Sequence, residues 1–348
     1  MFWEQGIRIV SHNGTIAYIT PNTWLNNQGA AKLRKFILET TAVVSILDCS
    51  RENVFASAVV LPIITILRKG PSIMEDVKIL EPDKDTFAIK NRISQGLWAA
   101  DDLKIFNIFL RYEDVSIRQK IESNSVDLEK IALVKFGIKL YETGKGTPSQ
   151  KPTDAKNHVF ESKTKLTVDY RRYLEGKDVD RFGINWQKRW LKYGENLAAP
   201  RDPALFLGSR LLFRRIVGER LIGAFTKDDF VTSQLLQIVK PFDGNLSKTL
   251  LALLNSALIA YYFKKKYNRQ DKTFPEIRIY ELAALPMPKL IVPKVAKLLT
   301  DLVDEIMRAK ASANEEQETL LEHEIDQQVY ALYGLTAEEI TIVEEATK

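Results

Sequence analysis

The sequence predicts a mixed α/β and α+β fold that ends in a helical C-terminal region. Residues 2–70 hold apolar, β-branched runs around one amphipathic segment, and residues 136–290 alternate short apolar stretches with turn residues. After Pro286-Met287-Pro288 the spacing is helical. With 348 residues, 45% hydrophobic and 27% charged, the chain is long enough for two globular domains.

Residues 1–70 form the first expected region. The turn pair Asn13-Gly14 separates a helical fragment from a strand, and Gly70-Pro71-Ser72 closes the region. Near-continuous apolar runs are typical of strands that are covered on both faces. The expected elements are helices at 2–10 and 30–39 and strands at 15–20, 43–47 and 54–67. In the second helix Leu33, Phe36 and Ile37 form the apolar stripe, and Arg34 lies off it.

Three further regions follow. Residues 71–135 are a connecting region with a strand at 77–80, and residues 136–290 form a separate domain that opens with a turn-rich loop. Within this domain, residues 246–266 have the length and spacing of a single helix. Residues 291–348 are helical, and Thr336 and Glu339 form a capping box after the helix-ending Gly334.

Charge is distributed unevenly along the chain. Residues 301–348 hold thirteen acids and three bases, whereas residues 1–300 hold 47 bases and 32 acids. Residues 163–220 alone carry fourteen Lys/Arg, seven Asp/Glu and eight aromatic residues. A basic body with interleaved aromatics and an acidic tail is typical of nucleic-acid binders, although an unevenly solvated surface gives the same counts.

Other classes of protein find little support in the sequence. Cys49 is the only cysteine, so a disulfide framework or a Cys-based zinc site is excluded and a reducing, cytoplasmic location is expected. The longest apolar run is shorter than the ~20 residues of a membrane span, and the N-terminus lacks a secretory pattern. His12, His158 and His323 are too dispersed for a metal triad.

Three blocks, in order, resemble the C-terminal part of adenine-specific DNA methyltransferases of the TaqI type, a group that includes the fused type IIG restriction-modification enzymes. Residues 13–39 and 46–70 resemble the last strands and helix of a Rossmann-like methyltransferase sheet. YRRYLEGKDVDRFGINW and the segments at 198–225 and 250–289 resemble the TaqI-like specificity domain, which recognises the DNA target. LEHEIDQQVYALYGLTAEEI is similar to the helical end of many such proteins.

The resemblance implies a DNA-recognising portion without its catalytic machinery. The Asn-Pro-Pro-Tyr or Asp-Pro-Pro-Tyr loop of the family is not in the sequence, and no glycine-rich turn follows a strand. We therefore expect no catalytic residue, no bound metal or cofactor, and no methyl transfer by this chain alone. An upstream methyltransferase domain would bind S-adenosylmethionine, and the expected partner of this chain is double-stranded DNA rather than a membrane.

Phe55 is the sharpest single candidate. It opens VFASAVV, where the resemblance implies an aromatic that stacks on the extruded adenine and offsets part of the unstacking cost. Burial in the core is the alternative interpretation of a Phe beside so apolar a run.

Lys145 lies in TGKGTPSQKP between two glycines that permit close backbone approach to phosphates. The pattern is not a P-loop, because Gly146 stands where Ser or Thr is required. A mobile surface loop is the alternative.

The remaining candidates are cations of residues 170–272. Arg214 and Arg215 must point to opposite faces of a strand, so only one can contact DNA, and an ion pair with Glu219 or a neighbour is the alternative. Asp178 and Asp180 are expected in a solvated turn. Lysines at the end of a helix also suit its negative dipole end. The candidate DNA-binding residues are Lys145, Arg171, Arg172, Lys177, Arg181, Arg214, Arg215, Lys264, Lys265, Lys266, Asn268, Arg269 and Lys272.

Three functions compete. The first is sequence-specific recognition of duplex DNA, and the second is a subunit of a split methyltransferase that a separate catalytic polypeptide completes. The third is an RNA-binding or protein-interaction module that uses the same charges, and competition between duplex DNA and RNA separates it from the first.

Overall fold

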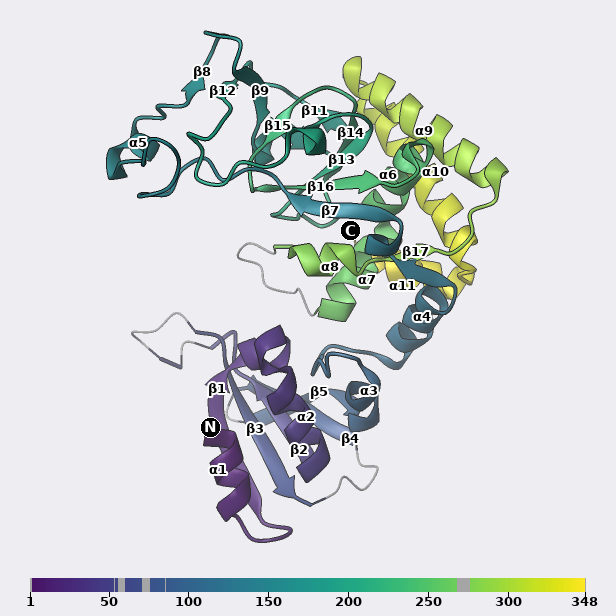
Figure 1. The fold of residues 1–348 in the computed structure, drawn as a ribbon. Coiled ribbons are helices and arrows are strands. Elements are labelled where there is room, and N and C mark those ends of the chain that lie inside the picture. The colour runs from purple at the N-terminus through teal and green to yellow at the C-terminus, as the bar shows by residue number, and fades with distance from the viewer. Residues whose placement is uncertain are drawn as a thin grey trace. The chain divides into compact units, whose positions relative to one another are not determined.

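The computed structural model describes residues 2–52, 54–55, 60–70, 76–84, 86–267 and 276–347. Contacts divide the chain into two compact units. The first unit is Met1–Ser116 with Lys264–Arg269, and the second is Ile117–Phe263 with Gln270–Lys348. The four regions predicted from the sequence, 1–70, 71–135, 136–290 and 291–348, stay a prediction. Figure 1 shows the elements of each unit.

The first unit is built on a five-stranded sheet of order β1-β3-β2-β4-β5. β3 lies between β1 and β2 and is antiparallel to both, β4 is parallel to β2, and β5 is antiparallel to β4. The strands are β1 Thr15–Pro21, β2 Thr41–Asp48, β3 Pro62–Lys69, β4 Asp76–Asp83 and β5 Thr86–Ser94. The helices are α1 Phe2–Ile9, α2 Ala31–Thr40 and α3 Gln95–Ala100.

These elements confirm most predictions for the first region, because each expected helix and strand up to residue 48 is present. Within the strand predicted at 54–67, the described strand β3 begins at Pro62, and residues 56–59 lie outside the described residues. β4 and β5 come from the expected connecting region and extend the same sheet. A mixed α/β arrangement is therefore confirmed at this coarse level.

Arg34 corrects one detail of this region. The apolar stripe of α2 leaves Arg34 on another face, yet its side chain is fully buried. Its guanidinium donates to the carbonyls of Lys104, Trp24, Asn27 and Leu103 at 2.7–2.8 Å. A buried charge is tolerated where its donors are satisfied, so Arg34 ties α2 to two loops of the unit.

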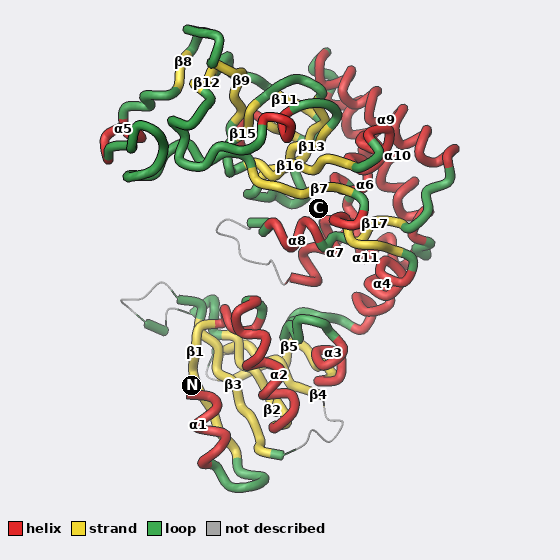
Figure 2. Tube along the Cα trace, in the orientation of Figure 1, coloured by secondary structure: helices red, strands yellow, loops and turns green. Residues whose placement is uncertain are grey.

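The second unit contains two four-stranded sheets and two short ribbons. The orders are β15-β9-β12-β8 and β14-β13-β16-β7, with β10-β11 and β17-β6 as the ribbons. Figure 2 shows how much of this unit is loop between short strands. The strands are β6 Ser125–Asp127, β7 Ala132–Phe136, β8 Glu161–Ser162, β9 Tyr170–Leu174, β10 Val179–Asp180, β11 Gly183–Ile184, β12 Trp190–Lys192, β13 Arg210–Arg214, β14 Gly223–Thr226, β15 Val231–Thr232, β16 Leu236–Pro241 and β17 Pro286–Pro288.

The C-terminal part of the chain is mostly helical. α6, α9 and α10 pack against one another, and α6 also contacts β14. Thr336 caps α11 by accepting from Glu339 N at 3.3 Å, and Gly334 ends α10 with a φ of 70°, so the predicted capping box is confirmed. The helices are α4 Tyr112–Ser123, α5 Pro152–Lys156, α6 Ser247–Asn255, α7 Ala257–Tyr267, α8 Ile279–Ala283, α9 Pro293–Ala311, α10 Glu315–Tyr333 and α11 Ala337–Ala346.

The helix predicted for residues 246–266 is wrong in one respect, because it is two helices bent by 61°. Ser256 leaves the helical region with a ψ of 156°. Next to the break, the Asn255 amide accepts from Gly223 N at 3.1 Å and donates to Gly223 O at 2.9 Å. Asp326 accepts from Ala257 N at 2.8 Å and so satisfies the start of α7. Side chains distant in sequence therefore stabilise the break.

No single helix of the described residues is long and apolar enough to cross a bilayer. The bent pair Gly244–Asn255 and Ala257–Tyr267 reaches that length and composition only when its two parts are combined. Nearly all side chains of this pair up to Phe263 are buried inside the protein, as in a core helix.

Candidate nucleic-acid interface

Two tryptophans and two cations lie together at the sheet β15-β9-β12-β8. Trp190 of β12 is directly opposite Arg172 of β9, and opposite residues of antiparallel strands share a face. The rings of Trp186 and Trp190 meet edge to face with centroids 5.5 Å apart, and Lys165 Nζ lies 5.8 Å from the Trp190 ring centre. We call Lys165, Arg172, Trp186 and Trp190 the tryptophan surface. Half-exposed aromatic rings beside cations are the combination on which bases stack.

Arg172 is already engaged within the protein. Its Nη2 lies 2.6 Å from Asp229 and 3.3 Å from Asp228, and its guanidinium is 4.5 Å from the Phe230 ring centre. The hydrogen bond from Arg172 lowers the pKa of the Asp229 carboxyl. By contrast Arg171, its neighbour in β9, is exposed, and its side chain forms no hydrogen bond or ion pair with the other described residues. Arg171 is therefore the stronger candidate for a phosphate contact.

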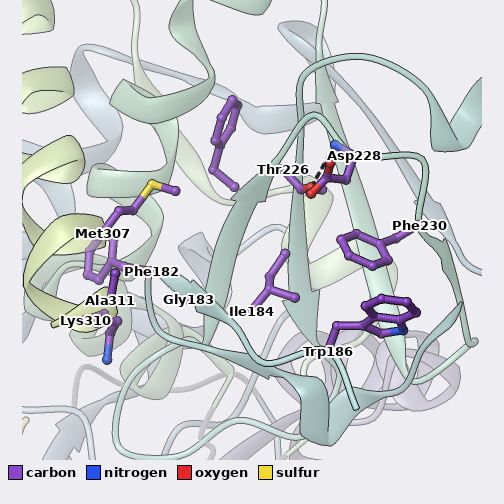
Figure 3. Close-up of a pocket in the computed structure, with 11 residues that line it drawn as sticks. Phe182, Gly183, Ile184, Trp186, Thr226, Asp228, Phe230, Met307, Lys310 and Ala311 are labelled. Atoms are coloured by element: carbon purple, nitrogen blue, oxygen red, sulfur yellow. Dashed lines mark hydrogen bonds between the residues drawn. The ribbon is translucent and has the colours of Figure 1, made fainter. Parts of the chain in front are cut away.

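A cavity of about 370 Å³ adjoins the tryptophan surface through Trp186. Figure 3 shows the rings of Trp186 and Phe230 close together, with Met307 and Lys310 of α9 on another wall. Lys310 Nζ lies 2.6 Å from Glu318, so the charge of this lysine is balanced. The cavity thus combines aromatic and apolar side chains with a few polar ones, among them Thr226 and Asp228, and it is not basic.

Arg181 and Arg214 make contacts inside the fold. Arg181 Nη2 lies 3.0 Å from Glu322 and donates to the Asn255 carbonyl at 3.1 Å. Burial lowers the pKa of Arg181 and raises the pKa of Glu322, because both charges lose water. Arg214 donates its Nε–H to the Val179 carbonyl. Both guanidiniums join neighbouring elements of the fold, so Arg181 and Arg214 are weaker candidates for DNA contact than exposed cations.

Arg215 and Lys177 are more exposed but are paired. Arg215 Nη2 lies 2.8 Å from Glu276, and the two side chains are 38% and 41% exposed. Arg215 therefore forms an ion pair with a neighbour, the alternative considered for it in the sequence, and that neighbour is Glu276. Lys177 Nζ lies 3.3 Å from Glu175, and the Lys177 side chain is 70% exposed. Exposed pairs of this kind are worth only ~0.2–1 kcal/mol, so a phosphate can displace them.

The lysine run at the end of α7 belongs to the first unit. Lys264, Lys265 and Lys266 are half-buried, and Lys265 Nζ lies 3.0 Å from the fully buried carboxylate of Asp114. Lys266 Nζ lies 6.0 Å from the Tyr267 ring centre. The other candidates of this run, Asn268, Arg269 and Lys272, lie outside the described residues.

The loop that carries Lys145 is held in place by Gln150, whose side chain is buried. The Gln150 amide accepts from Glu142 N at 2.8 Å and donates to the carbonyls of Leu140 and Asn196 at 2.9 and 2.7 Å. Gly144 and Gly146 adopt φ values of 83° and 79°, and a Cβ at Gly146 would lie 2.4 Å from Asn196 O. The exposed Lys145 thus stands on a hydrogen-bonded loop, while its contact with a phosphate stays a prediction.

Phe55 has a 43% exposed side chain in the first unit. Its neighbours at 53 and 56–59 lie outside the described residues, so its role in base stacking stays a prediction. The exposure does not favour the alternative of a core phenylalanine.

Arg210 and Arg189 were not identified from the sequence as residues that stabilise the fold. These two arginines account for part of the excess of basic residues. Arg210 of β13 is fully buried and donates to the carbonyls of Gly208, Asp228 and Phe230, and burial lowers its pKa to about 10. Arg189 pairs with Glu175 at 3.1 Å and with Asp178, which is buried rather than in the expected solvated turn. The position of Arg210 at the start of the apolar strand RLLFR was the available signal.

Comparison with known proteins agrees with the resemblance found in the sequence. Residues 171–287 match the family model of the TaqI-like C-terminal specificity domain. Residues 1–55 match the model of the Eco57I restriction-modification methylase. The chain therefore resembles restriction-modification methylases. A search of curated proteins found no match.

Among solved structures of similar proteins, one with a TM-score above 0.5 shares the fold. The Type IIL restriction-modification enzyme MmeI, in complex with DNA, is 12% identical with a TM-score of 0.60 over 99% of this chain and 51% of that one. The type IIG restriction endonuclease BpuSI is 13% identical with a TM-score of 0.39 over 96% and 49%. A DrdV–DNA complex is 10% identical with a TM-score of 0.45 over 88% and 39%. The chain spans about half or less of the length of these proteins.

Proposed function

We propose that this chain recognises duplex DNA as the C-terminal part of an adenine-specific, S-adenosylmethionine-dependent DNA methyltransferase of a restriction-modification system. The observation that carries the proposal is the match of residues 171–287 to a specificity-domain family, downstream of a methylase match at residues 1–55. Exposed cations and half-exposed tryptophans of the second unit support it, because phosphates and bases need these two kinds of group.

Within this proposal, Arg171 and Lys145 contact phosphates, while Trp186 and Trp190 provide the aromatic face. Lys177 and Arg215 reach DNA once their exposed carboxylate partners are displaced. Phe55 stacks on the extruded adenine. Methyl transfer, the cofactor and the Asn-Pro-Pro-Tyr loop are assigned to an upstream catalytic domain.

The free edge of β1 supports such a domain. Among the described residues β1 pairs only with β3, and the other side of its backbone has no strand partner. An edge strand exposes unpaired N–H and C=O groups and invites a further strand. We infer that upstream strands, in the same or a separate polypeptide, continue the Rossmann-like sheet at β1.

The test is equilibrium binding of the full chain to fluorescent duplex DNA between about 50 and 200 mM salt. We expect log K to fall linearly with log salt, with a slope of about −0.9 for each neutralised phosphate. Duplex RNA should compete poorly, since A-form geometry hides the base edges in its deep groove. Duplex DNA binding that does not respond to salt, or stronger binding to RNA, contradicts the proposal.

A split enzyme is the second candidate, because a separate polypeptide can supply the strand that the β1 edge accepts as well as the same polypeptide can. If a separate catalytic polypeptide exists, co-expression with the adjacent reading frame should give a stable complex that binds S-adenosylmethionine, while this chain alone shows no binding heat. Failure of the two proteins to co-purify counts against the split arrangement.

A further inference from the structure

A second concave site lies in the second unit, at the sheet β14-β13-β16-β7. The pocket has a volume of about 580 Å³ and is lined by residues of β7, β16 and the turn at 201–205, together with Ile279 of α8. Small-molecule sites typically occupy ~300–1,000 Å³, so this one has room for a single nucleotide. None of its residues was singled out from the sequence. Its main lining residues are Leu133, Lys135, Phe136, Arg201, Leu205 and Lys240.

The pocket lies between the edge strand β7 and the turn at 201–205. β7 is the last strand of its sheet and pairs with β16, so Leu133 is directly opposite Lys240. A 3-10 helix at Pro203–Phe206 packs over β16, with Leu205 in the same core as Ile238. Leu133 and Lys135 of β7 are exposed beside this turn, and Ile279 of α8 completes the lining of the pocket.

Two cations fix the walls of the pocket. Lys240 Nζ donates to Ala204 O at 2.9 Å, and Arg201 Nε donates to Gly137 O at 3.2 Å. Each bond ties the turn to the strands below it. A lysine has three N–H donors and an arginine five, so most donors of both groups are left for a ligand.

The charge of the pocket is positive. Lys135, Arg201 and Lys240 face one acid of the lining, Asp202, whose carboxylate accepts from Ala204 N at 2.9 Å and caps the turn. No ion pair joins any of the three cations to a carboxylate among the described residues. Three cations held around one space favour an anion, because their mutual repulsion falls when it binds.

The other wall is apolar. Leu133 is 38% exposed in the edge strand, and the half-buried Phe136 adds an aromatic ring. A site that combines convergent cations with apolar and aromatic walls fits a ligand that joins a phosphate to a flat apolar body.

We propose that this pocket holds one nucleotide of the DNA, with the phosphate on Lys135, Arg201 and Lys240 and the sugar or base against Leu133 and Phe136. This inference rests on the proposed function and adds a contact site on β7 to it. A free mononucleotide has the same chemistry, so the experiment includes it as a separate ligand.

Lys135 provides the cleanest test, because its side chain makes no contact that the fold needs among the described residues. Because Arg201 and Lys240 contact the same phosphate, Lys135→Ala and Lys135→Glu should reduce the salt slope of duplex binding by up to about 0.9, the share of one phosphate, and Lys135→Glu should reduce it more than Lys135→Ala. Lys294→Ala is the matched control, because Lys294 is an exposed lysine of α9 outside the pocket. Its slope should equal that of the wild type. Thermal unfolding checks that each variant is folded.

The outcomes separate this inference from the proposed function. If wild-type protein binds duplex and both Lys135 variants keep its slope, the nucleotide pocket is refuted and the proposed function stands. If wild-type protein binds no duplex, both are refuted. If thymidine monophosphate or adenosine monophosphate binds in a Lys135-dependent manner while the duplex slope is unchanged, the site takes a free nucleotide and the assignment to DNA is overturned.

Discussion

Replacement of Gln150 tests whether the Lys145 loop is preorganised. The Gln150→Leu variant keeps the approximate size of this 4% exposed side chain but removes its three hydrogen bonds of 2.7–2.9 Å. Leu140 O keeps a partner, Ala198 N at 3.1 Å. Glu142 N and Asn196 O lose the partner that Gln150 provides. At a net 0.5–1.5 kcal/mol for each bond, with a further cost for groups left unsatisfied, we expect about 2–4 kcal/mol of local destabilisation.

Amide hydrogen exchange measures this local effect directly. Because 1.36 kcal/mol is a factor of ten, 2–4 kcal/mol corresponds to exchange roughly 30-fold to several hundred-fold faster at Glu142 and Gly144. Gln187→Leu is the matched control, since Gln187 is exposed and donates only to Asn185 O at 3.2 Å among the described residues. Its exchange should be unchanged across the loop.

The same variant connects loop order to binding. If Lys145 contacts a phosphate from an ordered loop, Gln150→Leu and Lys145→Ala should each weaken duplex binding, and the double variant should lose less than the sum of the two. Unchanged exchange at Glu142 and Gly144 in Gln150→Leu refutes the preorganised loop. Additive losses of binding refute its coupling to Lys145.

Three further predictions concern pH, packing and charge. The hydrogen bond from Arg172 lowers the pKa of Asp229, so the stabilisation by this pair is present above the unfolded pKa of about 3.9 and is lost as pH falls through the lower folded pKa. The difference in unfolding free energy between wild type and Asp229→Asn should therefore shrink below about pH 4. A difference that stays constant with pH counts against the pair. Asn255→Ala removes two buried hydrogen bonds to Gly223 and should cost about 2–4 kcal/mol in urea unfolding, whereas exposed Asn185→Ala should cost less than about 0.5 kcal/mol. Arg181→Ala leaves Glu322 partly buried without its ion-pair partner, so it should reduce the unfolding free energy by roughly 3 kcal/mol and leave the salt slope of duplex binding unchanged. Arg171→Ala should reduce the salt slope by about 0.9 and leave the unfolding free energy nearly unchanged. The reverse pattern would show that the two arginines had been assigned the wrong roles.

Local signals in the sequence predicted local structure well. The Asn13-Gly14 turn, the strand at 15–20 and the Thr336 capping box depend on neighbouring residues, so their spacing was sufficient. The order of the family blocks was also readable, and the family matches at 1–55 and 171–287 agree with it. The break between α6 and α7 was not readable, because the groups that stabilise it, Gly223 and Asp326, are distant in sequence.

Tertiary structure decided what each cation does. Arg171 and Arg172 are adjacent in sequence, yet one is exposed and the other lies against two carboxylates some 57 residues away. No role for Lys135 or Lys240 was predicted from the sequence. The two lysines come together in one pocket only because β7 pairs with β16 and the turn at 203–206 lies beside them. The sequence by itself determined most elements of the first region, the excess of positive charge and the family resemblance. Only the fold decided which charges face carboxylates, carbonyls or open space, because electrostatic pairing depends on distance through space rather than on separation along the chain.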